Sequence, residues 1–249
     1  MRQGPKSLLI RPVSEAYEGD AVAASPSSFF GPLSGPLTGD EMFPDLARDD
    51  VFRLETPRLW LRWPRIRDAA AIHKFCSRWE VARFTARIPH PYPAGSAERF
   101  IYAAREANSA GRDLTLVMTP IRGKSDAVGS ISLESRGTDR LALGFALAPE
   151  VWGKGLATEA AERVIGAAFT LTRTVEILAS VRVENQASQT VLGKCGFVRI
   201  GTGLKGAPAR GGLVECHSFR LARADWAGAG APRRDASAPL AHAPVTGGP

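Results

Sequence analysis

The sequence contains few cysteines, and none of them is spaced for metal binding or cross-linking. Only three of the 249 residues are cysteine, at Cys76, Cys195 and Cys216, and no Cys-x-x-Cys pair occurs. An odd number at wide spacing supports neither a disulfide framework nor a zinc site. The four histidines are scattered along the chain and are interpreted as surface or partly buried residues. We therefore expect no metal.

Long hydrophobic runs are also missing. The apolar runs, such as 141–148, are far shorter than the roughly 20 residues that a membrane-spanning helix needs. Near the N-terminus the apolar stretch Leu8–Ile10 has only three residues, too few for a signal peptide. We therefore expect no membrane partner and, by default, a cytoplasmic location.

Positive charge is abundant and unevenly distributed. The net charge is +7; residues 1–50 carry 4 basic and 8 acidic side chains, whereas residues 51–226 carry 26 basic and 16 acidic ones. A basic domain can attract nucleic acid, a polyanionic cofactor or an acidic protein, and a merely solvated basic surface has the same composition. Since no aromatic-basic interleaving or recognition-helix pattern occurs, nucleic acid is not the expected partner.

Two terminal segments lack the periodicity of folded structure. Residues 1–50 include a stretch dense in Pro, Gly and Ser, and residues 227–249 are rich in Ala, Pro and Gly. Both are predicted to be disordered, which leaves one folded domain at 51–226. Met42 lies just before the first patterned segment and is a candidate translation start, which mass spectrometry of the native N-terminus would decide.

Hydrophobic periodicity inside the domain predicts an α/β fold with a mixed sheet, in the order β-α-α-β-β-β-α-β-α-β-β. The predicted strands are 58–63, 113–119, 127–133, 141–148, 175–183, 197–200 and 213–221. The predicted helices are one opened by Asp68 with Ile72, Cys76 and Trp79 on one side, one capped by Ser96, and two at 158–171 and 188–195.

A glycine-containing loop at the strand-to-helix junction of 141–160 is the most informative local feature. Gly153 and Gly155 remove Cβ atoms, so that a ligand can approach the backbone closely. The amides from Gly153 to Ala157 are expected to point outward at a helix N-terminus, with the charge of Lys154 beside them. This arrangement is typical of a pyrophosphate-binding site.

Three other interpretations of this loop are possible. A Walker loop requires GxxxxGK followed by Ser or Thr, which is absent. A dinucleotide fingerprint fits Gly153 and Gly155, with Glu176 as the later acid, but Thr158 stands where the third glycine belongs. A simple strand-to-helix turn without a ligand is the remaining alternative.

The loop resembles the acyl-CoA-binding motif Q/R-x-x-G-x-G/A of the GNAT family of N-acetyltransferases. Trp152 stands at the Gln or Arg position, and an aromatic residue there, followed by GxGxATEA, is similar to the RimJ/RimL-type branch that acetylates ribosomal-protein N-termini. The segment 184–197 is similar to the second family motif, N-x-x-[AS]…GF. The segments 55–62 and 89–93 also resemble that branch, so the similarity extends over about 170 residues.

The resemblance implies the GNAT fold and acetyl-CoA as co-substrate. Strands 141–148 and 175–183 would splay apart, and the pantetheine arm would pair with the backbone at Phe145, Ala146 and Leu147 as an added strand. A backbone N–H there would polarise the thioester carbonyl. The other residues implied in acetyl-CoA binding are Trp152, Gly153, Lys154, Gly155, Leu156, Ala157, Asn185 and Ser188.

The catalytic groups are less clearly indicated. The amine would attack directly, so Cys195 is not a candidate nucleophile. Many relatives place a Tyr where this chain has Leu192, and Ser188 or water could protonate the leaving thiolate instead. The predicted strand 141–148 carries no carboxylate, which leaves Glu134 as candidate base, either directly or through water. An ordinary surface carboxylate is the alternative for Glu134.

The similarity to the RimJ/RimL type favours a protein or peptide N-terminal α-amine as acceptor. A small-molecule acceptor, such as a polyamine, an aminoglycoside or an amino acid, is the alternative within the family. The alternative outside enzymes is a non-catalytic acyl-CoA sensor or a nucleic-acid-binding module. A homodimer is compatible with the sequence.

Overall fold

The computed structural model describes residues 52–123 and 126–228. The expectations for 1–50, including Met42, and for nearly all of 227–249 lie outside the described residues. Helix α6 (Arg223–Gly228) continues two residues past the predicted domain end. The domain limits of 51 and 226 stay a prediction.

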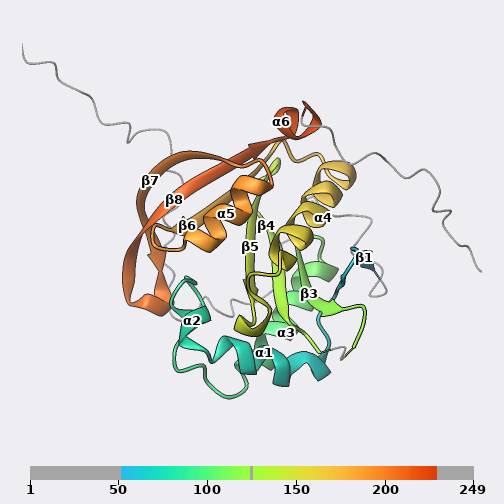
Figure 1. The fold of residues 1–249 in the computed structure, drawn as a ribbon, viewed down its shortest axis with the longest axis vertical. Helices are drawn as coiled ribbons and strands as arrows, with labels where there is room; N and C mark the ends of the chain where they lie inside the picture. The colour runs from blue at the N-terminus through green and yellow to red at the C-terminus, as the bar shows by residue number, and fades with distance from the viewer. Residues whose placement is uncertain (1–51, 124–125, 229–249) are drawn as a thin grey trace, which may run out of the picture. The chain divides into compact units, whose positions relative to one another are not determined.

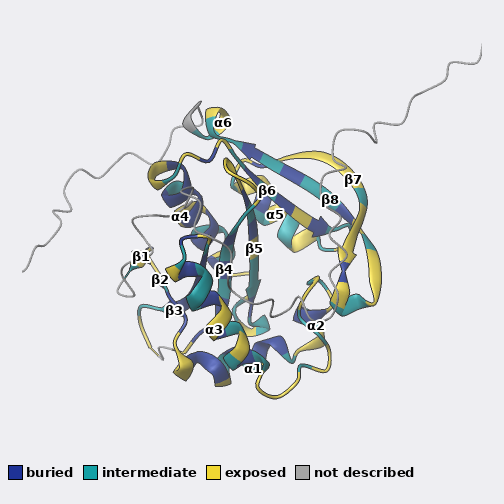
Figure 2. Cartoon of the chain, turned by 180° about the vertical axis from the view of Figure 1, so that it is seen from behind, coloured by how far each residue is buried: buried dark blue, intermediate teal, exposed yellow. Residues whose placement is uncertain are grey.

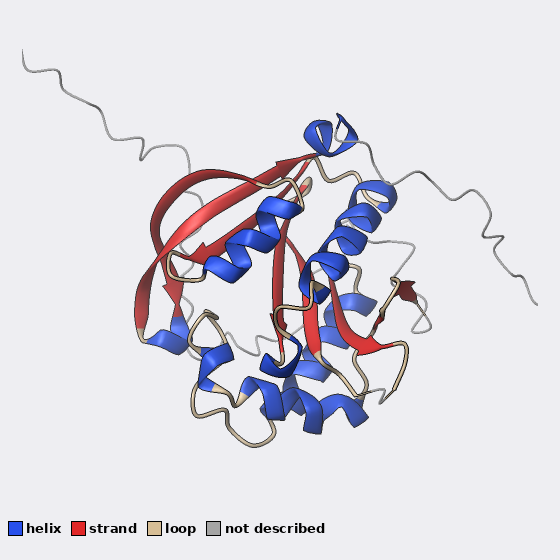
Figure 3. Ribbon diagram, viewed as in Figure 1, coloured by secondary structure: helices blue, strands red, loops and turns tan. Residues whose placement is uncertain are grey.

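The described chain alternates strands and helices largely in the predicted order (Figure 3). The strands are β1 (Arg53–Glu55), β2 (Leu59–Arg62), β3 (Asp113–Pro120), β4 (Gly129–Ser135), β5 (Arg140–Leu147), β6 (Glu176–Arg182), β7 (Val198–Ala207) and β8 (Gly212–Ala222). The helices before α6 are α1 (Ala69–Cys76), α2 (Trp79–Ala82), α3 (Ser96–Ser109), α4 (Leu156–Leu171) and α5 (Gln186–Lys194).

The strands form one eight-stranded sheet in the order β1-β2-β3-β4-β5-β6-β8-β7 (Figure 1). Every neighbouring pair is antiparallel except β5 and β6, which run parallel and are joined through α4. Parallel neighbours need such a crossover, whereas antiparallel ones can be joined by short turns. The predicted mixed α/β fold is therefore confirmed.

Helices cover both faces of the sheet. Helices α4 and α5 lie in front of it in Figure 1, and Figure 2 views the other face, with α1 and α3. Because side chains alternate across a strand, Leu141, Leu143 and Leu147 of β5 point into the core with α4, whereas Ala146 packs with α1 and α3. Strand β5 therefore lies between two hydrophobic cores.

Strand β7 is much longer than the predicted strand 197–200. Strand β7 continues past Gly201, Gly203 and Gly206 to Ala207 and pairs with β8 along its length. Nearly all of β7 is exposed. Pairing with β8 thus overrides the weak strand propensity of glycine.

The first two predicted helices begin and end differently from the expectation. Helix α1 ends at Cys76, and Trp79, predicted to share its buried side, lies in the separate turn α2 with 50% of its surface exposed. Ser96 is the first residue of α3 rather than its cap, because Gly95 at φ 75° occupies the N-cap position.

Asp68 is buried and forms a bidentate ion pair with Arg62. Its carboxylate oxygens lie 2.8 Å from the two terminal Arg62 nitrogens, and the Arg65 N–H donates to it at 2.7 Å. We expect Asp68→Ala to lower the free energy of unfolding by about 3–5 kcal/mol, because it leaves a buried guanidinium unpaired. Chemical denaturation would measure the loss. Glu80→Gln, which removes an exposed partner of Arg78, should change stability little, and equal losses would contradict the prediction.

Candidate functional site

The two parallel strands β5 and β6 separate after only three residue pairs. Their register is Arg140↔Glu176, Leu141↔Ile177 and Ala142↔Leu178, although both strands continue beyond it. The predicted splay is therefore confirmed. From residue 143 onward, the edge of β5 that faces β6 is not paired with that strand.

Beyond the splay, the backbone N–H groups of β5 point alternately toward β4 and toward the gap that separates β5 from β6. The Ala148 N–H donates to the Val128 carbonyl at 2.8 Å, on the β4 side. Because backbone groups alternate along an antiparallel ladder, Ala146 also faces β4, whereas Phe145 and Leu147 direct their N–H groups toward the gap. Of the three residues predicted to pair with pantetheine, Ala146 is therefore not oriented for direct backbone pairing.

The indole of Trp152 connects the following loop back to β5. Its Nε1 donates to the Leu147 carbonyl at 2.9 Å, and 45% of the residue is exposed. The short turn η3 (Pro149–Val151) separates the two residues. The Leu147 carbonyl thus already accepts a hydrogen bond from Trp152. This bond fixes the start of the loop from Trp152 to Ala157 relative to β5.

Two glycines with positive φ shape this loop. Gly153 has φ 73° and Gly155 has φ 75°, a left-handed conformation that side chains disfavour. A Cβ on Gly153 would meet no atom within 4 Å, so one side of the loop is open. Gly155 is the N-cap of α4, and its carbonyl accepts the first helical bond, from the Glu159 N–H at 3.1 Å.

Helix α4 therefore begins two residues earlier than predicted, directly at the loop. The side chain of Leu156 is buried in the core and Ala157 packs against it, so these residues present backbone rather than side chains to the loop. The N–H groups of a first helical turn have no partner within the helix and lie at its positive end. Lys154 is exposed, and its ammonium donates to the Glu150 carbonyl at 3.0 Å.

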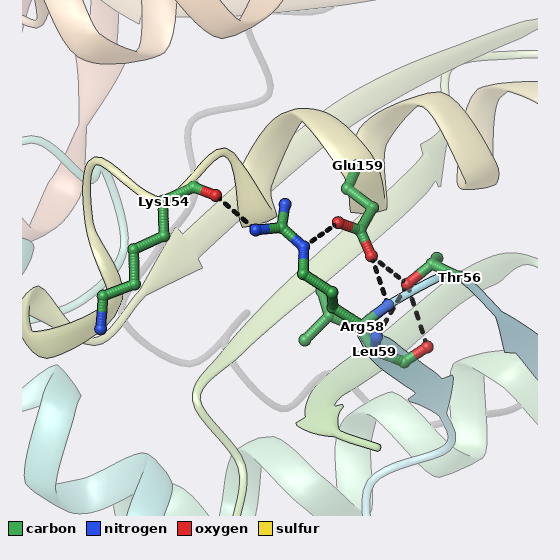
Figure 4. Close-up of polar contacts among 5 residues, drawn as sticks. All are labelled: Thr56, Arg58, Leu59, Lys154 and Glu159. Atoms are coloured by element: carbon green, nitrogen blue, oxygen red, sulfur yellow. Dashed lines mark hydrogen bonds and ion pairs between the residues drawn. The ribbon is translucent and has the colours of Figure 1, made fainter. Parts of the chain in front are cut away.

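A guanidinium from far earlier in the chain braces the loop (Figure 4). Arg58 Nη1 donates to the Lys154 carbonyl at 2.8 Å, and its Nε donates to Glu159 Oε2 at 2.6 Å. Glu159 Oε1 accepts from the Arg58 N–H at 2.8 Å and from the Thr56 hydroxyl at 2.6 Å. The turn between β1 and β2 is thereby tied to the first turn of α4.

Sequence reasoning did not find these three residues as partners. Thr56 and Arg58 belong to the segment 55–62, and Glu159 follows the loop in ATEA, but about one hundred residues separate them. Burial raises the pKa of Glu159, but hydrogen bonds from Thr56 and Arg58 together lower it by more, so that the pKa lies below its usual value. The carboxylate is therefore held in its charged form.

Asn185 and Ser188 lie at the start of α5, beside the splay. Asn185 is the N-cap, and its side-chain oxygen accepts from the Ser188 N–H at 3.1 Å. Asn185 therefore caps α5. Both residues are half-buried and lie just after β6 in the chain.

Neither Leu192 nor Cys195 offers a reactive group to the gap. Leu192 is fully buried in the core. Cys195 packs against the same core, and burial raises its pKa to about 12. A thiol with so high a pKa is a poor nucleophile at neutral pH.

Glu134 is engaged in two ion pairs. It lies opposite Ala142 in the β4–β5 ladder, on the sheet face away from α4. One carboxylate oxygen pairs with Arg87 and the other with Arg136 at 2.9 Å. Both carboxylate oxygens of Glu134 are therefore engaged by guanidinium groups.

Basic side chains border the open face of the splay, where Gly144 and Ser180 are exposed. Arg182, at the end of β6, donates to the Arg83 carbonyl at 2.9 Å, and Arg210 donates to the Ile88 carbonyl. Burial and the nearby charge of Arg182 lower the pKa of Arg210. Among the described residues, no carboxylate forms an ion pair with Arg210.

The described residues contain no group of three or more His, Cys, Asp or Glu side chains that could hold a metal ion. They also contain no helix long and apolar enough to cross a membrane.

A family comparison agrees with this geometry. The family described as Acetyltransferase (GNAT) domain matches residues 58–198, which include the splay, the loop and the start of α5. The chain belongs to the GNAT family. A GNAT domain transfers an acyl group from acyl-CoA to an amine, so this chain is an acetyl-CoA-dependent N-acetyltransferase.

Among curated proteins, this GNAT chain is 25% identical to "Uncharacterized N-acetyltransferase p20" of Bacillus licheniformis over 177 residues, 70% of this chain and 98% of the relative. Among solved structures, RimJ of Mycobacterium smegmatis with CoA-disulfide has a TM-score of 0.60 at 22% identity, covering 72% of this chain and 94% of that one. Spermidine N-acetyltransferase of Vibrio cholerae, solved with CoA and spermine, has a TM-score of 0.57 at 19% identity, covering 68% and 98%. At these identities the two structures establish the shared fold.

Proposed function

We propose that this GNAT enzyme acetylates the α-amine at the N-terminus of a protein or peptide. The observation that supports the donor side is the splay between β5 and β6, which opens beside the positive N-terminal end of α4. A linear donor with a pyrophosphate at one end and a thioester at the other matches this layout.

The donor would lie along β5. The amides of the loop from Gly153 to Ala157 would bind the pyrophosphate, with Lys154 adding charge and Trp152 shaping the loop. The pantetheine arm would follow β5 past Leu147 to Phe145, whose N–H points into the gap. Asn185 and Ser188 would contact the arm from α5.

The reaction needs no covalent enzyme intermediate. The neutral amine nitrogen attacks the thioester carbonyl carbon, a C–N bond forms, and the C–S bond breaks with release of the CoA thiolate. The Phe145 N–H would stabilise the developing oxyanion. The amine loses one proton, and the thiolate gains one from Ser188 or water.

The reaction needs no strong general base when the acceptor is an α-amine. A free α-amine has a pKa of about 7.7–8.0, so a large fraction is already neutral near pH 8. Glu134 lies on the sheet face away from α4, and Arg87 and Arg136 pair with its two oxygens. We therefore propose that Glu134 mainly orders Arg87, and that water accepts the proton of the amine.

The charges on the open face support an α-amine over a polyamine. A polyamine is a polycation and needs unpaired carboxylates around its amines. Here Glu134 pairs with two arginines, Glu184 pairs with Arg182, and Arg210 adds positive charge. A peptide N-terminus carries a single amine and tolerates such surroundings better.

Peptide acetylation assays would test the acceptor. The lysine pKa of about 10.4 lies roughly 2.5 units above that of an α-amine, which makes the neutral lysine roughly 300-fold rarer. We expect peptides with a free N-terminus to be acetylated about 10²-fold faster than N-blocked peptides with an internal lysine. The rate should rise with pH and level off near 8.

A small amine is the second candidate, because one solved relative is a spermidine N-acetyltransferase. Spermidine belongs in the same assay as a competing acceptor. Faster acetylation of spermidine or of the internal lysine than of every N-terminus tested would show that the acceptor assignment is wrong. The GNAT assignment would be unaffected.

A further inference from the structure

We infer that Arg58 binds the pyrophosphate of acetyl-CoA directly and that Glu159 is the residue that positions it. Arg58 lies in the turn between β1 and β2, outside the Gly153–Ala157 loop, and is half-exposed. The inference rests on the proposed placement of the pyrophosphate at this loop. It adds a recognition group from a distant segment to the donor site.

Glu159 fixes the orientation of the Arg58 guanidinium through its Nε. Its Oε2 accepts from Arg58 Nε at 2.6 Å, and its Oε1 accepts from the Arg58 N–H at 2.8 Å. Thr56 donates its hydroxyl to the same Oε1 at 2.6 Å, so the carboxylate has little freedom to turn. Charge-assisted bonds of this length are among the strong ones in proteins.

The bonds to Glu159 orient the two terminal nitrogens of Arg58, Nη1 and Nη2, toward the loop. Nη1 donates to the Lys154 carbonyl at 2.8 Å, while Nη2 has no hydrogen-bond partner in the part of the chain that the structure describes. A Cβ built on Gly155 would lie 3.5 Å from Nη2. The guanidinium therefore borders the space that Gly155 leaves empty, where a phosphate must approach the backbone.

Lys154 is the one charged side chain in the segment 152–157. Trp152 is uncharged and its indole is bonded to β5, and the Lys154 ammonium is bonded to the Glu150 carbonyl. A planar guanidinium with a free edge suits a phosphate better than a flexible ammonium does. Arg58 thus offers the oriented cation that a doubly charged pyrophosphate requires.

Calorimetry with CoA on the full-length protein would test this role. We expect Arg58→Gln to weaken CoA binding by about 10- to 100-fold, and Glu159→Gln to weaken it by a smaller factor. For acetyl transfer, both should raise the KM for acetyl-CoA with little change in kcat. Acetyl-pantetheine, which has no pyrophosphate, should be used equally well by wild type and Arg58→Gln.

Arg163→Gln is a matched control. Arg163 is exposed on α4 and donates to the Glu55 carbonyl at 3.1 Å, so it also ties α4 to the N-terminal strands, but farther along the helix. The Arg163→Gln protein should bind CoA with the wild-type affinity. Equal CoA affinities of Arg58→Gln and Arg163→Gln would overturn the inference, as would an equal loss with acetyl-pantetheine, which would indicate a purely structural role.

The binding assay needs no acceptor, so an error in the acceptor assignment does not affect it. If Gly155→Asp abolishes CoA binding while Arg58→Gln does not weaken it, the pyrophosphate site stands and the inference about Arg58 is wrong. If Gly155→Asp binds CoA normally, the proposed donor site fails together with the inference.

Discussion

Gly155→Asp should abolish the binding of acetyl-CoA while leaving the protein folded. The substitution places a side chain and a negative charge where the loop backbone would contact the pyrophosphate. The new carboxylate would also lie beside Arg58, because a Cβ at this position is 3.5 Å from Nη2. Asp tolerates the left-handed backbone conformation better than most residues, so the fold should persist. Calorimetry with CoA would measure the loss, and circular dichroism would verify the fold.

Gly137→Asp is the control for the backbone cost of this change. Gly137 also has a positive φ, 95°, and a Cβ there would meet no atom within 4 Å. It lies in the turn between β4 and β5, away from the loop. This variant should bind CoA normally. A folded Gly155→Asp protein with unchanged CoA affinity would rule out the proposed pyrophosphate site.

Phe145→Pro should reduce kcat by roughly 10²- to 10³-fold, the usual cost of removing one oxyanion donor. Proline lacks the N–H that would stabilise the oxyanion, yet this N–H is not part of the β4–β5 ladder. Strands tolerate proline where the N–H side is unpaired, as β5 is beyond the splay. Steady-state kinetics would measure the effect.

Phe145→Leu separates the backbone group from the side chain. It keeps the N–H and should retain most of the activity. The affinity of Phe145→Pro for CoA should fall by only about tenfold or less, because a single hydrogen bond is lost. A Phe145→Pro protein that binds CoA and turns over at the wild-type rate would show that another group stabilises the oxyanion.

The strand and helix order was predictable because hydrophobic periodicity is local. Apolar residues occupy every second position of β5 (Leu141, Leu143, Phe145 and Leu147), and the buried residues of α4 repeat at helical spacing. The glycine loop was also predictable, since glycine adopts positive φ more readily than any other residue. Strand β7 was underestimated because its stability comes from pairing with β8 rather than from its own residues.

Tertiary structure decided the environment of the candidate side chains. Glu134 was selected as a carboxylate near the end of a strand, but the fold brings Arg87 to it from a segment 47 residues earlier. Arg58 and Glu159 are separated by 101 residues, so no local pattern relates them. The direction of each β5 backbone group likewise depends on its register with β4.

The sequence by itself thus determined the mixed α/β fold, the glycine-containing loop before α4 and the family. These features depend on residue types at short spacing, which chain geometry translates directly into strands, helices and turns. Only the tertiary structure decided which charges are neutralised and which remain available, as for Glu134 and Arg58. Such pairing depends on contacts between segments distant in sequence, because an ion pair is specified by spatial proximity rather than by spacing along the chain.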